Sequence, residues 1–138
     1  MERVIRALSE AEQSALYDGL EMASKMLNKP RPLSSSDIQG LYDYCLSSED
    51  EFPEGVIAVG LSFGQLFIDA ENYEWVRVND EYGEETCIAP KFLNINCAPI
   101  SMIQKRLEAQ EQVNIAELFA DTVKVIQGLI DDGEFEYR

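Results

Sequence analysis

The sequence feature that most constrains the fold is an almost wholly apolar stretch at residues 56–68, in which only Ser62 and Gln65 are polar. On a helix these two residues and Asp69 fall at i, i+3 and i+7, so they form one narrow polar stripe on an apolar surface. The stretch shows no two-residue alternation and is longer than a typical buried strand. A membrane-spanning helix needs about 20 apolar residues. The pattern therefore predicts a core helix that is buried on most sides.

Two glycines, Gly60 and Gly64, lie one helical turn apart within this stretch. Each glycine costs about 1 kcal/mol of helix propensity relative to alanine. In return, a helix face without side-chain bulk lets another element approach closely. We therefore expect this face to pack tightly against a neighbouring helix or against the sheet.

A strand that contains the single tryptophan follows the apolar helix and leads into an acidic turn. Residues 73–78 alternate between two faces, as a strand does. Residues 79–83 predict a hairpin connection in which Gly83 supplies the left-handed residue. Residues 86–89 form the returning strand, and residues 93–97 alternate as a half-buried third strand. The sequence therefore predicts a three-stranded antiparallel meander.

Signals for the start of a helix occur on both sides of this meander. They are Ser9 with Glu12, the serines 34–36, Pro53, Pro99, and Asn114 with Glu117. Serine and asparagine at these places cap the first helical turn, and proline is tolerated within it.

These signals predict the fold class α+β, with N-terminal helices, the three-stranded antiparallel meander and then two C-terminal helices. A chain of 138 residues is expected to form one compact domain, residues 1–138. Residues 47–54 predict a short acidic loop, and the tail at residues 134–138 is expected to fray.

Charge restricts the possible partners. The chain has 26 acidic and 11 basic residues and a formal net charge of −15. Twelve of the acidic residues lie between residues 43 and 85, where Arg77 is the only basic residue. Such a surface repels phosphate backbones and anionic lipids, so we expect no nucleic acid and no membrane partner. A basic protein is a compatible partner, and the oligomeric state stays open.

The cysteines and the first residues predict a cytoplasmic protein. Residues 1–10 lack the apolar core of a signal peptide. Cys45, Cys87 and Cys97 are odd in number and show no C-x-x-C spacing, which is typical of reduced thiols. We interpret each cysteine as a small buried hydrophobic residue.

The absence of histidine excludes histidine-based nucleophile pairs and histidine-ligated zinc. No phosphate-binding G-x-x-x-x-G-K-[ST] loop is present. Pairs of carboxylates such as Asp80 with Glu84 leave a hydrolase or a weak cation site open, although solvated surface acids explain them more simply. We expect no cofactor and no metal site, and we assign no catalytic residue.

Lys105 and Arg106 are the only adjacent basic residues, and they lie on the helix after the meander. We predict that one of them forms an ion pair with Asp80 or Glu81. Such a pair would join the hairpin turn to this helix. Two solvated charges on a helix surface are the alternative, because an exposed ion pair contributes only about 0–1 kcal/mol.

Two segments resemble a known family. Residues 75–83 read W-V-R-V-N-D-E-Y-G and residues 99–106 read P-I-S-M-I-Q-K-R, with G-L-S-F-G upstream at residues 60–64. Over roughly residues 55–120, the chain resembles an uncharacterised bacterial domain-of-unknown-function family. The resemblance implies bacterial origin, one compact domain and no assigned activity. The motif positions that it implies are Trp75, Asp80, Glu81, Tyr82, Gly83, Lys105 and Arg106.

We predict a non-enzymatic protein-interaction or accessory protein, with an immunity protein as one form, that binds a basic partner through its acidic surface. Two alternatives stay open: a small-molecule binding module with a pocket near Trp75 and Tyr82, and a carboxylate-dependent hydrolase around Asp80. A polar pocket walled by aromatic residues would favour the module, and a flat acidic face would favour protein binding. The candidate ligand- or partner-binding residues are Trp75, Asp80, Glu81, Tyr82, Lys105 and Arg106.

Overall fold

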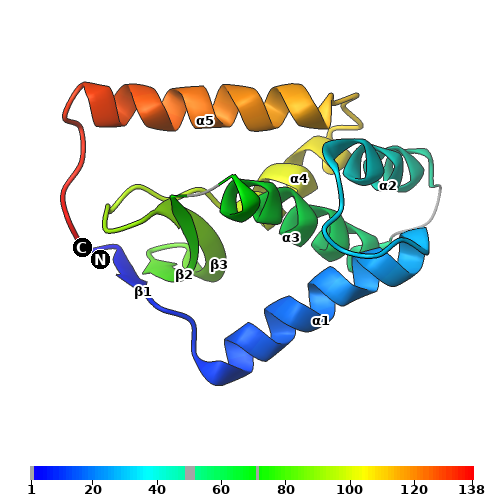
Figure 1. Cartoon of the computed structure of the whole chain (residues 1–138), viewed down its shortest axis with the longest axis horizontal. Helices are drawn as coiled ribbons and strands as arrows, with labels where there is room; N and C mark the ends of the chain where they lie inside the picture. The colour runs from blue at the N-terminus through cyan, green and yellow to red at the C-terminus, as the bar shows by residue number, and fades with distance from the viewer. Residues whose placement is uncertain (1, 49–51, 71) are drawn as a thin grey trace.

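The computed structural model describes residues 2–48, 52–70 and 72–138, which form five helices and one three-stranded antiparallel sheet (Figure 1). The elements in chain order are β1 (Val4–Arg6), α1 (Glu10–Leu27), α2 (Ser35–Ser47), α3 (Pro53–Asp69), β2 (Tyr73–Asp80), β3 (Gly83–Pro90), α4 (Pro99–Glu108) and α5 (Ile115–Asp131). The α+β class is therefore confirmed. Within the described ranges, no helix combines the length and apolar character needed to cross a membrane.

Helix α3 is the central element of the fold. It contacts each of the other helices and both long strands, and Figure 1 shows it in the middle of the molecule. Phe63 and Phe67 are fully buried and pack edge to face, with ring centroids 5.4 Å apart. Pro53 begins the helix, where its missing N–H is not needed. The prediction of a core helix from the apolar stretch is confirmed.

The two glycines of α3 form the closely packed face that the sequence predicts. A Cβ atom built on Gly60 would lie 2.7 Å from the Cα atom of Ile100, at the start of α4. A Cβ atom on Gly64 would overlap the ring of Trp75 and lie 2.9 Å from Cγ of Pro99. Both α4 and β2 therefore approach α3 at positions where only glycine fits. We call the surface of α3 that is formed by Gly60 and Gly64 the glycine face.

Strands β2 and β3 form the predicted hairpin. Trp75 pairs with Ile88, and Asp80 pairs with Gly83, which leaves a two-residue turn. Gly83 has φ of +122°, in the region that favours glycine, and no atom lies within 4 Å of a Cβ built on it. Glycine is therefore needed here for its backbone conformation and not for space.

The third strand lies elsewhere than predicted. It is β1, which pairs antiparallel with β2 and places Ile5 opposite Val78. The predicted strand at residues 93–97 forms only isolated bridges, one from Cys97 to Ile88 and one from Leu93 to Tyr137. Its alternation arises because an extended segment buries every second side chain in the core without joining a ladder. At three residues, β1 is too short to show any periodicity.

The C-terminal tail is ordered, so the prediction that it frays is wrong. The backbone N–H of Arg138 donates to the carbonyl of Phe92 at 2.8 Å, and that of Asn94 donates to the carbonyl of Glu136 at 2.9 Å. The Arg138 guanidinium also donates to the carbonyl of Pro90 at 3.0 Å. These hydrogen bonds replace the ones that a frayed tail would make with water.

The predicted helix caps are present. The side chains of Ser9, Ser34 and Asn114 each accept a backbone N–H three residues later. The predicted acidic loop at residues 47–54 is described only in part, because residues 49–51 lie outside the described residues.

A group of ion pairs joins β1 to α1 and to the hairpin. Arg6 contacts Glu12 at 2.7 Å, and Arg77 contacts Glu12 and Glu84 at 3.2 Å each. The hydrogen bond from Arg6 is the main reason that the pKa of Glu12 falls from 4.5 to about 2. Because the folded-state pKa is lowered, this carboxylate stabilises the fold above pH 4.5, and its contribution is lost as the pH falls toward 2.

We predict that Gly64→Ala destabilises the protein by about 1–3 kcal/mol, because the new methyl group overlaps the rigid Trp75 ring. The matched control is Gly128→Ala on α5, where no atom lies within 4 Å of the built Cβ. The control should be neutral or stabilising by up to about 1 kcal/mol, since alanine favours helix. Urea denaturation measures both. Equal stability of the two variants would contradict the close packing of the glycine face.

Candidate functional site

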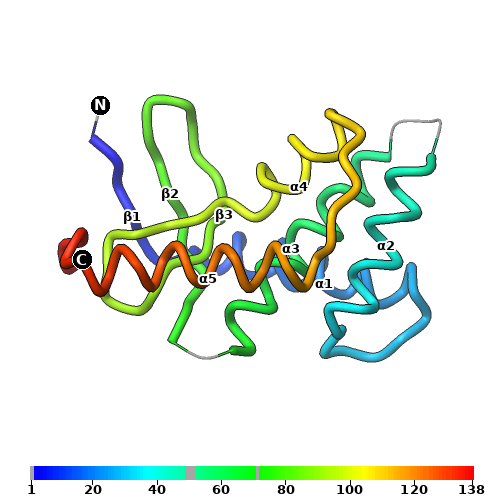
Figure 2. Tube along the Cα trace, turned by 90° about the horizontal axis from the view of Figure 1, so that it is seen from above, coloured from blue at the N-terminus to red at the C-terminus, as the bar shows by residue number. Residues whose placement is uncertain are grey.

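Most of the predicted site residues gather in a groove between the β2–β3 hairpin and α4. This groove, which we call the hairpin groove, encloses about 600 Å³. Its lining residues are Asp80, Tyr82, Gly83, Glu84 and Glu85 from the hairpin, and Ala98, Ser101, Met102, Lys105 and Arg106 from the segment of α4. Glu81 lies in the same hairpin turn. Figure 2 shows the tip of the hairpin at the edge of the molecule, with α4 beside it.

The predicted ion pair across this groove does not form. Among the described residues, the ion pairs within 4.0 Å include none that joins Asp80 or Glu81 to Lys105 or Arg106. Instead, Oδ1 of Asp80 accepts the backbone N–H of Tyr82 at 2.9 Å. This hydrogen bond holds the Asp80 carboxylate against its own turn.

A different contact joins the hairpin to α4. The Ser101 hydroxyl donates to Oε2 of Glu85 at 2.8 Å. On the same helix, the Arg106 guanidinium donates to the carbonyl of Met102 at 3.0 Å. One of its donors is therefore already used within α4. The hairpin and α4 are therefore in contact as predicted, but through a different pair of side chains.

The exposed tip of the hairpin is aromatic and acidic. Tyr82 is 89% exposed, more than any other large apolar or aromatic residue in the described ranges. Glu84 is held by Arg6 at 2.5 Å and by Arg77 at 3.2 Å. Asp80 and Glu81 have no cationic partner within the part of the chain that the structure describes. The tip therefore presents an exposed ring next in sequence to two carboxylates that have no cationic partner among the described residues.

Trp75 lies apart from the other predicted site residues. Its ring packs on Gly64, and its indole N–H donates to Oε1 of Gln65 at 3.1 Å. Tyr82 lines the hairpin groove, at the other end of strand β2. The two aromatic residues are therefore not placed together as walls of one pocket.

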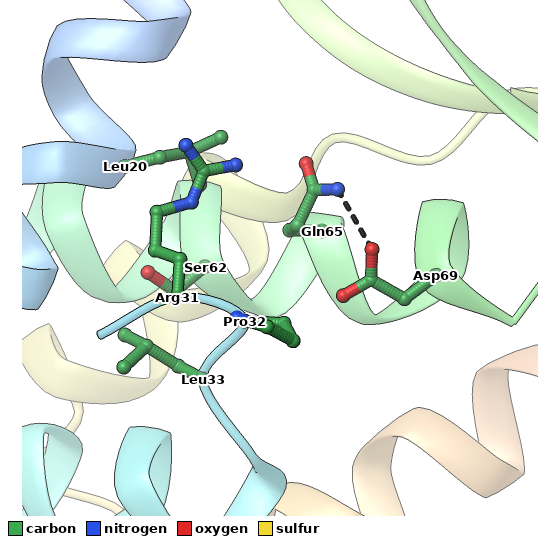
Figure 3. A pocket seen from close by; sticks show the side chains of 7 residues that line it. All are labelled: Leu20, Arg31, Pro32, Leu33, Ser62, Gln65 and Asp69. Atoms are coloured by element: carbon green, nitrogen blue, oxygen red, sulfur yellow. Dashed lines mark hydrogen bonds between the residues drawn. The ribbon is translucent and has the colours of Figure 1, made fainter. Parts of the chain in front are cut away.

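A second recess, which was not predicted from the sequence, lies between α1, the segment after α1, and α3 (Figure 3). It encloses about 340 Å³, and we call it the α1–α3 pocket. It is lined by Leu20, Arg31, Pro32, Leu33, Ser62, Gln65 and Asp69. The signal that could have found it is the polar stripe on the apolar helix, because all three residues of the stripe line the pocket.

The polar side chains of this pocket are held in place by their neighbours. Gln65 accepts the Trp75 indole N–H and donates its own amide to Oδ1 of Asp69 at 2.9 Å. Arg31 lies 3.5 Å from the Glu21 carboxylate and 5.7 Å above the ring of Tyr17. The pocket therefore has a cation and a carboxylate that belong to different elements and do not pair with each other.

The cysteines are free thiols. Cys87 is buried, as predicted, whereas Cys45 and Cys97 are half-buried. Burial is the main reason that the pKa of Cys87 and of Cys97 rises to about 12, so both stay protonated near neutral pH. Within the described ranges, no three cysteine, aspartate or glutamate residues are placed to hold a metal ion together.

The fold is that of a small α+β domain built on a glycine-containing central helix. The model of a domain of unknown function, DUF3806, matches residues 37–119, which is more than half of the chain. The chain therefore belongs to this family. The matched region begins before residue 55, at which the resemblance noted in the sequence starts. It includes both family-like segments, residues 75–83 and 99–106. No curated protein matches the chain.

A solved structure shares the fold. It is a crystal structure of a protein from Bacteroides thetaiotaomicron VPI-5482, with a TM-score of 0.72 and 17% sequence identity. The match covers 89% of this chain and 48% of the other, so this chain spans about half the length of its structural neighbour. At this identity the likeness concerns the fold alone.

We predict that a double-mutant cycle on Ser101→Ala and Glu85→Ala gives a coupling energy of about 0.5–1.5 kcal/mol, as expected for a hydrogen bond to a charged group at a surface. The control cycle, Asp80→Ala with Arg106→Ala, should give a coupling near zero, because these side chains form no ion pair. Unfolding by urea measures both. A larger coupling in the control cycle would contradict the arrangement of the groove.

Proposed function

We propose that this protein is a non-enzymatic interaction protein that binds a basic segment of a partner protein at the hairpin tip and the hairpin groove. One observation carries the proposal. Tyr82 is 89% exposed at the tip, beside exposed Glu81 and half-buried Asp80, and neither of these carboxylates has a cationic partner among the described residues.

The chemistry of this tip suits an arginine or lysine side chain. Tyrosine is enriched at the centre of protein interfaces, where it contributes a large rigid area at little entropic cost. A guanidinium group can stack on such a ring while it donates two hydrogen bonds to a carboxylate. An aromatic residue beside carboxylates therefore favours a basic partner over a neutral one.

The charge of the whole chain supports the same partner. A net charge of −15 attracts a basic protein over a distance and repels an acidic one, which raises the rate of productive encounters. Because exposed charges are screened by salt, the proposed association weakens as the ionic strength rises.

The two cations on the opposite wall are compatible with this partner. Arg106 is partly engaged by the carbonyl of Met102. The Lys105 ammonium group has no hydrogen-bond or ion-pair partner among the described residues, so it is free to take an acceptor from the partner. An extended peptide offers basic side chains to the hairpin and backbone carbonyls to Lys105. The groove thus suits a strand-like basic segment.

We propose that the protein acts in the cytoplasm of a bacterium, as an accessory or immunity-type protein. The free thiols of Cys45, Cys87 and Cys97 support a reducing compartment. The bacterial source of the structural neighbour supports the origin.

The test is a selection from a library of short random peptides against the whole chain, followed by fluorescence anisotropy with the selected peptides. Selected peptides should be rich in arginine and lysine. Tyr82→Ala should weaken binding about tenfold, equivalent to about 1.4 kcal/mol, and Glu81→Lys should weaken it further. The matched control is Tyr44→Ala, since Tyr44 is also exposed, at 63%, but lies on α2. Peptides without basic enrichment, or equal effects of the two tyrosine variants, would contradict the proposal.

A further inference from the structure

The α1–α3 pocket contains a buried hydroxyl group that lacks a partner. Ser62 is 3% exposed, and its Oγ atom has no hydrogen bond in the structure. Within a helix, such a hydroxyl commonly donates to the carbonyl of the preceding turn. Thr122 of α5 does so, with its Oγ1 atom 2.7 Å from the carbonyl oxygen of Leu118. Because a buried hydroxyl is costly to leave unsatisfied, Ser62 needs a partner that enters from the pocket it lines.

Arg31 supplies a positioned cation to the same pocket. The Tyr17 ring and the Glu21 carboxylate hold the guanidinium from outside. The contact with Glu21 is 3.5 Å long, at the limit of a hydrogen bond, and it involves one of the terminal nitrogens. Most of the guanidinium donors therefore remain available, in the planar arrangement that suits a carboxylate.

Asp69 supplies a positioned acceptor. The hydrogen bonds from Trp75 to Gln65 and from Gln65 to Asp69 fix the orientation of both polar side chains. Gln65 uses its carbonyl for Trp75 and one amide proton for Oδ1 of Asp69, so its second amide proton and Oδ2 of Asp69 are left for a ligand. Figure 3 shows Arg31 and Asp69 on opposite sides of the recess, with Gln65 between them and Ser62 behind Arg31.

The remaining wall is apolar. Leu20, Pro32 and Leu33 line the pocket around Arg31, with Leu20 beside the guanidinium group. At about 340 Å³, the pocket lies at the lower end of the range of roughly 300–1,000 Å³ found for ligand sites. It is thus sized for a metabolite and not for a nucleotide or a peptide.

We propose that the α1–α3 pocket binds a small carboxylic acid that carries an α-ammonium or α-hydroxyl group and an apolar side chain, that is, an amino acid or an α-hydroxy acid. The carboxylate of the ligand lies against Arg31 and accepts a hydrogen bond from Ser62. Its ammonium or hydroxyl group donates to Asp69, and its side chain lies against Leu20 and Leu33. This site is separate from the hairpin groove, and the proposal does not depend on the proposed partner.

An ordered water is the competing explanation for Ser62. One water molecule would satisfy the hydroxyl, but it takes up only about 30 Å³, a small part of the pocket. A water would also leave the guanidinium of Arg31 and Oδ2 of Asp69 without a common ligand. The two explanations differ in what the purified protein binds.

The experiment is a thermal-shift screen of the whole chain, confirmed by isothermal titration calorimetry. The probes are the individual standard L-amino acids and, in a second arm, α-hydroxy acids such as L-lactate, L-2-hydroxyisocaproate and L-phenyllactate. We expect at least one apolar member to bind saturably and to raise the melting temperature. Binding in the first arm alone assigns an ammonium group to Asp69, and binding in the second assigns a hydroxyl. If no probe binds in either arm, solvent alone fills the pocket and the proposal is wrong.

Variants then locate the site with the probe that binds. Asp69→Asn should weaken binding about tenfold, since the variant loses the charged acceptor. Its matched control is Asp131→Asn, because Gln127 donates to Asp131 at 2.8 Å in the same i, i+4 geometry, on α5. Equal effects of the two variants would overturn the assignment of the site.

Two further variants separate ligand binding from folding. Ser62→Ala removes an unsatisfied hydroxyl, so we expect an unchanged or higher melting temperature without ligand and about tenfold weaker binding of the probe. Arg31→Lys keeps the charge and loses the planar pair of donors, so binding should fall with little change in melting temperature. Wild-type affinity in both variants would contradict the proposed roles.

Discussion

The contact of the glycine face of α3 with α4 and β2 is the constraint on which the rest of the structure depends. Gly60 admits the backbone of Ile100, and Gly64 admits the ring of Trp75 and the edge of Pro99. Three elements thereby meet at distances that no side chain on α3 would allow. This close approach sets the position of α4 relative to the hairpin, so it also sets the width of the hairpin groove. The cost of two glycines in a helix, about 1 kcal/mol each, is offset by the burial that the contact permits.

The same helix shapes the second recess. The polar stripe of α3, Ser62, Gln65 and Asp69, is directed toward α1 and the segment after it, where Arg31 completes the α1–α3 pocket. Trp75 links the two sides, because its ring rests on the glycine face while its indole N–H orients Gln65. The buried helix α3 thus positions both the hairpin groove and the α1–α3 pocket. A change in its packing would alter the shape of both.

Much of this arrangement could be predicted from local patterns. The apolar stretch, the helix caps and the hairpin each follow from a few neighbouring residues, and the structure confirms them. Strand β1 could not be predicted, because three residues are too few to show a periodicity. Residues 93–97 were predicted as a strand because their side chains alternate in burial, although they pair only through isolated bridges. The contribution of Arg31 to a pocket could not be predicted either, since it comes from a separate element. The choice of Ser101 and Glu85 over the predicted ion pair depends on side-chain direction, which spacing does not encode.

The most direct test of this account is the set of nuclear Overhauser effects of the glycine Hα protons in the labelled protein. We expect cross-peaks from Gly64 Hα to the Trp75 indole ring protons, and from Gly60 Hα to the side chain of Ile100. Both follow from contacts in which a built Cβ would be too close to its neighbour. Cross-peaks that connect the Trp75 ring to other residues while both glycine contacts are missing would contradict the central role of this face.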